Sequence, residues 1–218
     1  MINLGVLVSG NGTNLQVIID SIEAKRLDAR IRIVISNNPN AYATTRAKKH
    51  HIPAFIIQDN KFSNREACDK HLLDILQSHS IDLVVLAGFT RLLTPLFIKS
   101  FPMKILNIHP ALLPAFPGLH VQKKAVDYGV KFSGCTVHIV DEGIDTGPII
   151  IQAVVPVHTD DTEETLAQRI LKQEHRIYPQ AIQFFAEGRI EVKGRKVIVK
   201  DQPEIAGVLE NPQVEIFK

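Results

Sequence analysis

Short apolar runs rich in β-branched residues alternate along this chain with segments in which apolar residues return every three or four positions. The runs cover residues 2–8, 31–35, 54–57, 83–87 and 104–108, and the helical segments between them cover 15–25, 41–50 and 64–78. This alternation predicts right-handed βαβ crossovers and a mostly parallel sheet. Because the runs are almost continuously apolar, we expect helices on both faces, as in a doubly wound α/β fold.

The pattern changes after a proline-rich turn. Strand-like residues 135–140 and 149–157, joined by the loop DEGIDTGP, are expected to pair as antiparallel neighbours at the sheet edge. A long C-terminal helix from about 162 to 187 should follow, kinked or split at Pro179, because proline lacks the helical N–H donor. Residues 190–200 are typical of a small hairpin before a polar tail. We therefore expect a single domain over 1–190 and a C-terminal hairpin and tail over 191–218.

Composition disfavours several classes of protein. Apolar residues make up 45% of the 218 and charged residues 22%, as in an ordinary globular protein. The apolar runs are too short to span a bilayer, and the opening strand pattern does not resemble a signal peptide. A net charge of +2 gives no argument for nucleic acid. Cys68 and Cys135 lack the spacing of a disulfide framework or thiolate metal site, which favours the cytoplasm.

The first strand leads into SGNGTN at 9–14 and then directly into a helix. Backbone N–H groups and a helix N-terminus meet there, which favours an anion such as phosphate. The loop departs from the dinucleotide-binding fingerprint, because Leu15 occupies the third glycine position and no carboxylate follows the second strand at 36–38. The alternative is a tight turn capped by Thr13 or Asn14. Its place at the carboxyl end of a parallel strand favours phosphate.

The segment KILNIHPALLPAFPG at 104–118 is the clearest candidate for catalytic chemistry. Residues i and i+2 of a strand share a face, so Asn107 and His109 present an amide and a titratable ring side by side. We expect this strand end to lie beside the loop of the first strand. A buried histidine satisfied by a backbone carbonyl is the alternative, but it explains neither Asn107 nor the rigid prolines Pro110 and Pro114.

An acid is expected to complete this pair. Asp145 is the best candidate because Gly143 and Gly147 flank it and allow close approach of the backbone. Asp141 and Glu142 compete for the role, with a solvated turn as their alternative. An amide to stabilise an oxyanion, a histidine to move charge and a carboxylate to raise the histidine pKa form an acyl-transfer set.

Other chemistries have weaker support. Ser9 and Ser133 lack a neighbouring base, and Cys135 lies in a strand where a packed thiol is expected. Direct attack by a substrate amine is therefore the simpler reaction. A metal site is disfavoured because the histidines show no HxH or HExxH spacing and the cysteines no CxxC spacing. The candidates for such a site would be His109, His120, His138 and Asp145.

Five segments carry a resemblance to a known family. They read VSGNGTNLQ at 8–16, VVLAGFTRLL at 84–93, LNIHPALLPAFPGLH at 106–120, CTVHIVDEGIDTGPII at 135–150 and QEHRIYP at 173–179. Together they resemble the folate-dependent formyltransferases, specifically those that act on phosphoribosylglycinamide. The resemblance implies a Rossmann-like formyltransferase fold and transfer of a formyl group from 10-formyltetrahydrofolate, a co-substrate, to the amine of phosphoribosylglycinamide in purine biosynthesis. Another formyltransferase or hydrolase that uses 10-formyltetrahydrofolate is the alternative, because NIHP…LLP…D…GP is shared more widely.

The resemblance also implies roles for individual residues. The catalytic residues would be Asn107, His109 and Asp145. Phosphoribosylglycinamide would contact Gly12, Thr13, Asn14 and Glu174. Folate would contact Arg65, Thr90, Arg91, Leu92, Leu93, Asn107, Asp141 and Asp145. Thr90 departs from the family pattern, in which methionine is common. We expect no metal, no nucleic acid and no membrane partner, and either a monomer or a homodimer.

Overall fold

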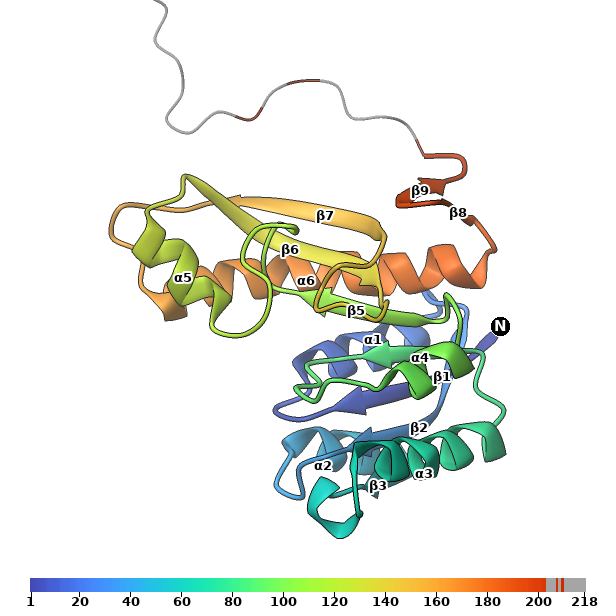
Figure 1. Cartoon of the computed structure of the whole chain (residues 1–218). Coiled ribbons are helices and arrows are strands. Elements are labelled where there is room, and N and C mark those ends of the chain that lie inside the picture. The colour runs from blue at the N-terminus through green and yellow to red at the C-terminus, as the bar shows by residue number, and fades with distance from the viewer. Residues whose placement is uncertain (203–206, 208, 210–218) are drawn as a thin grey trace, which may run out of the picture.

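Seven strands form a central sheet (Figure 1). The strands are β1 Ile2–Val8, β2 Ala29–Ser36, β3 Ala54–Ile56, β4 Leu83–Leu86, β5 Ile105–His109, β6 Phe132–Ile139 and β7 Ile149–Pro156. The computed structural model describes residues 1–202, 207 and 209. The spatial order is β3-β2-β1-β4-β5-β6-β7, with β1 to β5 parallel and β6 and β7 antiparallel to their neighbours. This confirms the predicted doubly wound, mostly parallel sheet with an antiparallel edge.

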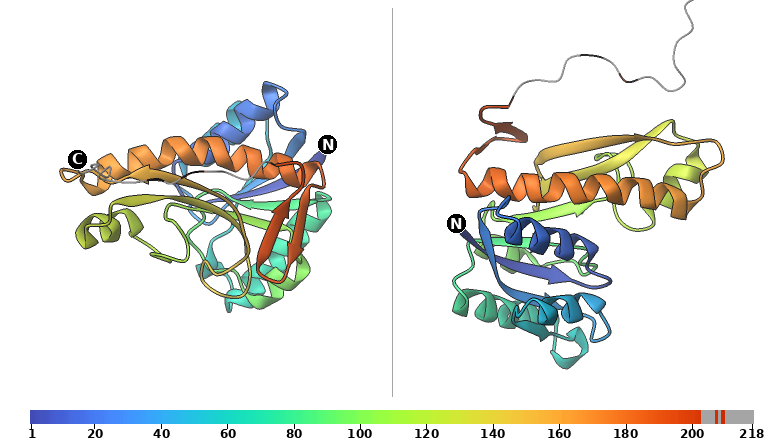
Figure 2. Two further views of the ribbon diagram at one scale, coloured as in Figure 1. Left: turned by 90° about the horizontal axis from the view of Figure 1, so that it is seen from above. Right: turned by 180° about the vertical axis from the view of Figure 1, so that it is seen from behind.

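Helices cover both faces of the sheet (Figure 2). They are α1 Thr13–Glu23, α2 Tyr42–Lys49, α3 Arg65–Ser78, α4 Pro95–Ser100, α5 Val121–Tyr128 and α6 Glu163–Ala186, with a short 3-10 helix, η1, at Asp59–Lys61. Side chains of α1, α2, α5 and α6 pack into one apolar core, and those of α3 and α4 pack into a second core on the opposite face. Burial on both faces explains why the strands are almost uninterrupted apolar runs.

The sequence pattern did not predict η1, α4 or α5. Both η1, with three residues, and α4, with six, are too short to show a helical period. Of the eight residues in α5, only Val121 and Ala125 are buried, so the helix carries little of an apolar stripe. A kink or a split was predicted at Pro179, and the split does not occur, since α6 continues through Pro179 over 24 residues. Buried side chains on both sides of Pro179 hold the two halves against the sheet.

Tyr178 joins α6 to the centre of the sheet. Its side chain is fully buried, and its hydroxyl lies 2.9 Å from the Leu86 carbonyl oxygen and 3.0 Å from that of Leu106. A tyrosine hydroxyl has one proton to donate, so the two carbonyls share it. Leu86 is the last residue of β4 and Leu106 belongs to β5, so one side chain ties the helix to both strands.

The direction of winding reverses between β1 and β4. The chain proceeds outward from β1 through β2 and β3 and then crosses back to β4 on the other side of β1. Ligands of open α/β sheets bind at the carboxyl ends of the strands beside such a switch point. The glycine loop, residues 9–14, follows β1 there. From the sequence we expected the end of β5 near the glycine loop; in the sheet β4 lies between β1 and β5, so these two strands are not themselves neighbours. The sequence pattern predicts the order of the strands along the chain but not their order in the sheet.

The C-terminal hairpin predicted at 190–200 is present as β8 (Ile190–Lys193) and β9 (Lys196–Val199), which pair antiparallel. The polar tail expected after it lies, apart from residues 201, 202, 207 and 209, outside the described residues. In the part of the chain that the structure describes, no helix combines the length and apolar character needed to cross a membrane.

Both cysteines of the chain are free and buried. Burial raises the pKa of the Cys68 thiol to about 11, and a hydrogen bond to Asp59 acts in the same direction. Burial raises the pKa of Cys135, in β6, to about 12. Cys135 is thus the packed thiol that its strand position predicted.

Tyr178→Phe tests the bond between α6 and the sheet. The change removes the hydroxyl donor that the two carbonyl oxygens share, so we expect the free energy of unfolding to fall by about 1–2 kcal/mol. Urea denaturation followed by circular dichroism measures it. Tyr128→Phe, at a side chain that is 80% exposed, is the matched control and should change little. Equal stability of Tyr178→Phe and the wild type would contradict this role.

Candidate active site

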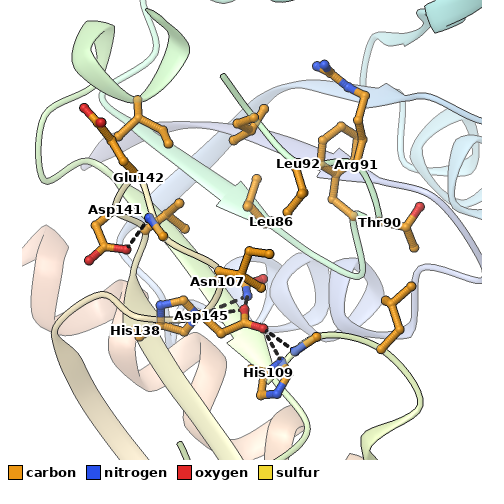
Figure 3. A pocket seen from close by; sticks show the side chains of 18 of the residues that line it. Leu86, Thr90, Arg91, Leu92, Asn107, His109, His138, Asp141, Glu142 and Asp145 are labelled. Atoms are coloured by element: carbon orange, nitrogen blue, oxygen red, sulfur yellow. Dashed lines mark hydrogen bonds and ion pairs between the residues drawn. The ribbon is translucent and has the colours of Figure 1, made fainter. Parts of the chain in front are cut away.

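Four polar side chains converge where β5 and β6 pair (Figure 3). Asn107 and His109 both belong to β5, and the antiparallel register places His138 of β6 directly opposite Asn107. Asn107 Nδ2 lies 3.1 Å from His138 Nε2 and 3.5 Å from Asp145 Oδ1. His109 Nδ1 lies 3.4 Å from Asp145 Oδ2. The predicted convergence of Asn107, His109 and Asp145 is therefore present in the structure.

Asp145 reaches this cluster from the loop between β6 and β7. Its backbone is left-handed, with φ of 53°, a conformation that L-residues rarely adopt. Asp145 Oδ2 accepts a 2.9 Å hydrogen bond from the Gly118 N–H. A Cβ on Gly147 would lie 1.7 Å from the Ile139 carbonyl oxygen, so only glycine lets the backbone approach so closely here. Gly147 thus has the steric role that the sequence predicted.

The other acids of this loop have different partners. Asp141 Oδ1 accepts hydrogen bonds from the Gly143 N–H and the Thr146 hydroxyl, at 3.2 and 2.6 Å. The Glu142 carboxylate lies 3.4 Å from Lys99 Nζ at the surface. Asp141 therefore shapes the turn and Glu142 faces solvent, so Asp145 alone of the three enters the cluster.

Burial and hydrogen bonding determine the protonation states of His109 and Asp145. Burial disfavours the imidazolium and lowers the pKa of His109 below its ordinary value, although the Phe116 carbonyl and Asp145 oppose this effect. Burial also disfavours the Asp145 carboxylate. Interaction with His138 and the Gly118 N–H outweighs burial and holds the Asp145 pKa below its usual range. A neutral His109 therefore faces an ionised Asp145 near neutral pH.

The contact of His109 with the Phe116 carbonyl oxygen determines which ring nitrogen carries the proton. Its Nε2 lies 2.9 Å from the Phe116 carbonyl oxygen, which can only accept, so Nε2 carries a proton and donates it. In the neutral ring, Nδ1 then carries a lone pair toward Asp145. A proton that arrives on Nδ1 is placed against the carboxylate. The pair can therefore accept and hold one proton.

His138 is the member of the cluster that the sequence analysis did not assign. It is 2% exposed, and its Nδ1 lies 3.0 Å from the Ile139 carbonyl oxygen. We considered His138 only as a metal ligand, because no local spacing links it to Asn107, 31 residues away. The pairing of residues 104–108 with 135–140 is the signal that could have found it, since an antiparallel partner strand places a residue opposite Asn107.

A cavity of about 1240 Å³ opens beside the cluster. Its volume exceeds the range of about 300–1,000 Å³ that is common for small-molecule sites, so it can hold a large ligand. It is lined by all eight residues expected to contact folate and also by His109, His138 and Leu119. The structure therefore brings the predicted folate residues and the catalytic candidates to one cavity.

The side chains of both arginines among the expected folate residues are bound to other parts of the protein. The Arg91 guanidinium contacts Asp69, which is fully buried and also accepts a 2.7 Å hydrogen bond from the Thr94 N–H. Arg65 Nη2 donates to the Leu92 carbonyl oxygen at 2.7 Å. Both arginine side chains therefore shape the wall formed by residues 88–94, and Arg91 points away from the cluster in Figure 3.

The glycine loop and Glu174 form a neighbouring polar group. Gly12 precedes α1 with φ of 70°, and no side chain caps the helix, so its first N–H groups stay available. Asn14 Nδ2 donates to Glu174 Oε2 at 2.7 Å, and burial raises the pKa of Glu174. The Asn14 side-chain oxygen is buried without a partner among the described residues.

This group is separate from the folate cavity but connected to it. None of Gly12, Thr13, Asn14 and Glu174 belongs to the described lining of the larger cavity. The connection is Ser9, whose hydroxyl oxygen accepts hydrogen bonds from the Thr90 N–H at 2.9 Å and the Thr90 hydroxyl at 3.2 Å. The threonine that departs from the family pattern thus joins the two loops.

Comparison with known proteins places this fold and site in a class. A family model described as formyl transferase matches residues 2–182. The phosphoribosylglycinamide formyltransferase of Escherichia coli K12 is 42% identical over 190 residues, which are 87% of this chain and 90% of that protein. A crystal structure of glycinamide ribonucleotide transformylase 1 from Symbiobacterium toebii is 50% identical, with a TM-score of 0.91, and the match covers 92% of this chain and 95% of that one.

The chain therefore belongs to the formyl transferase family. Within that family it groups with the phosphoribosylglycinamide formyltransferases. It is also 46% identical over 187 residues to the trifunctional purine biosynthetic protein adenosine-3 of Drosophila melanogaster, a match that covers 85% of this chain and 14% of that protein. The chain thus spans about a seventh of the length of that relative.

The protonation of His109 is directly measurable. We expect NMR titration to give His109 a pKa below the ordinary value of about 6.5 because its ring is buried. Asp145→Asn should lower this pKa further, since it removes the carboxylate that stabilises the imidazolium. Glu142→Gln, a change of a solvent-facing acid in the same loop, should leave it unchanged. A pKa above 6.5, or no response to Asp145→Asn, would contradict the described electrostatics.

Proposed function

We propose that this chain transfers the formyl group of 10-formyltetrahydrofolate to the amine of 5′-phosphoribosylglycinamide in purine biosynthesis, with Asn107, His109 and Asp145 as the catalytic residues. The assignment of these residues rests on one observation. The three side chains converge on the wall of a single cavity, and all the expected folate residues line the same cavity. Membership of the phosphoribosylglycinamide formyltransferases supports the choice of both substrates.

The chemistry follows from the donors and acceptors of the cluster. The substrate amine attacks the formyl carbon, a C–N bond forms and the formyl oxygen becomes negatively charged. The Asn107 Nδ2 group is placed to donate a hydrogen bond to that oxygen. The amine nitrogen loses a proton, which the His109 and Asp145 pair accepts directly or through water, and the pair passes a proton on to the folate nitrogen, while the charged oxygen re-forms the formyl C=O bond. The bond from the formyl carbon to the folate nitrogen then breaks and tetrahydrofolate leaves.

His138 supports this arrangement as a positioning residue. Its ring contacts the Asn107 amide at 3.1 Å and lies 3.7 Å from Asp145 Oδ1. It therefore limits the orientations of the two groups that must face the formyl carbon. Accurate placement of reacting groups is a large part of catalysis in transfer reactions.

The glycine loop supplies the second half of the proposed site. The uncapped N-terminus of α1 offers backbone N–H groups and the positive end of the helix dipole to a phosphate. Gly12, Thr13 and Asn14 would bind the phosphate end of the substrate. Glu174, held by Asn14, would contact the ribose or glycinamide end.

We assign the activity to residues 1–190 and place the reaction in the cytoplasm, where free buried thiols such as Cys68 and Cys135 persist. For the oligomeric state we propose either a monomer or a homodimer.

Substitution of the cluster tests the proposal. With both substrates present, a spectrophotometric assay of tetrahydrofolate formation should show losses of about 10²-fold or more for Asn107→Ala, His109→Ala and Asp145→Asn. Asp127→Asn, a change of an exposed acid on α5, should keep full activity. An inactive wild type would refute the function, and full activity of the three variants would refute the residues. Turnover without the amine substrate would instead indicate a hydrolase.

Gly12→Ala tests the phosphate loop. The new Cβ would lie 2.6 Å from the Ala43 Cβ at a position where φ is 70°, so the loop must shift. We expect the KM for phosphoribosylglycinamide to rise about tenfold or more, a loss of about 1.4 kcal/mol of binding, with little change in the KM for folate. Gly10→Ala, whose Cβ meets nothing within 4 Å, is the control. An equal effect of both substitutions would argue against a specific phosphate loop.

A further inference from the structure

The C-terminal hairpin contacts the loop that carries Asp145. Arg195, in the turn between β8 and β9, donates from Nη2 to the Thr146 carbonyl oxygen at 2.6 Å. This contact joins residues 49 positions apart in the chain. Viewed from above in Figure 2, the hairpin extends from the end of α6 toward this loop. The hairpin lies beyond the segments that carry the family resemblance.

The base of the hairpin is anchored firmly enough to direct its tip. Arg189 donates from Nε and Nη2 to the Lys200 carbonyl oxygen at 2.9 and 2.6 Å, and its guanidinium lies 4.8 Å from the Phe184 ring centroid on α6. Ile190 and Val192 pack against the core that α6 shares with the sheet. Arg195 is therefore presented to the loop by a support that is attached to the body of the protein.

The backbone of the loop that carries Asp145 requires contacts that hold it in place. Asp145 adopts a left-handed backbone, which persists only where neighbouring contacts hold it. Thr146, the next residue, is held by its hydroxyl bond to Asp141 and by the charge-assisted bond from Arg195 to its carbonyl. The second of these is the contact that reaches the loop from the hairpin.

We propose that Arg195 is a positioning residue for formyl transfer, which holds the Thr146 carbonyl so that Asp145 stays against His109. The inference rests on the proposed function, because it takes Asp145 as a member of the catalytic cluster. Arg195 itself is exposed at the protein surface and does not belong to the described lining of the folate cavity. It acts only through the loop.

The full-length variants Arg195→Ala and Arg195→Lys test this role against Lys196→Ala, which removes the adjacent exposed cation from the same hairpin. For Arg195→Ala we expect kcat to fall about tenfold, the scale of a small misplacement of a catalytic group, with unchanged KM for phosphoribosylglycinamide and unchanged resistance to urea. Arg195→Lys keeps a donor and should recover most of kcat. Lys196→Ala should match the wild type.

NMR titration of His109 gives a readout that does not require turnover. If Asp145 withdraws in Arg195→Ala, the His109 pKa should fall toward that of Asp145→Asn. A wild-type pKa and kcat in Arg195→Ala would overturn the inference, and so would equal losses in Lys196→Ala or a loss of stability that accounts for the loss of kcat. A wild type without formyl transfer would refute the proposed function and leave the titration as the test of the contact.

Discussion

The antiparallel pairing of β6 with β5 is the constraint on which the site depends. It sets His138 opposite Asn107, and the loop from β6 to its antiparallel partner β7 returns Asp145 to Asn107 and His109. The mixed sheet thus brings the cluster together, because β5 supplies Asn107 and His109, β6 supplies His138, and the loop after β6 supplies Asp145.

Buried polar contacts on both faces of the sheet hold β4 and β5 in place beside the site. Tyr178 ties α6 to the β4 and β5 carbonyls, while Asp69 and Arg91 tie α3 to the wall after β4. Each face of the sheet therefore contributes a fully buried polar anchor beside β4. Buried polar groups carry a large penalty when they lose their partners, so such anchors permit few alternative arrangements.

Local patterns predicted the elements that have a strong period. The strands of the parallel half, the helices α1 to α3 and the meeting of Asn107, His109 and Asp145 followed from apolar spacing and from glycine and proline positions. The rest depended on contacts between distant residues. The position of β4 between β1 and β5, the partner of Asn107 on β6 and the continuity of α6 through Pro179 are all set by packing that a local window does not contain. The roles of Arg65 and Arg91 in the loop wall belong to the same class.

The burial of both thiols has a practical consequence for experiments in solution. With pKa values near 11 and 12, Cys68 and Cys135 are almost entirely protonated at neutral pH, with about one thiolate in ten thousand or fewer. Maleimide reagents act on accessible thiolates, so the native cysteines should stay unlabelled in the folded protein. A single cysteine introduced at an exposed site could then carry a fluorophore without removal of either natural residue, and the same reagent would report unfolding when the core opens.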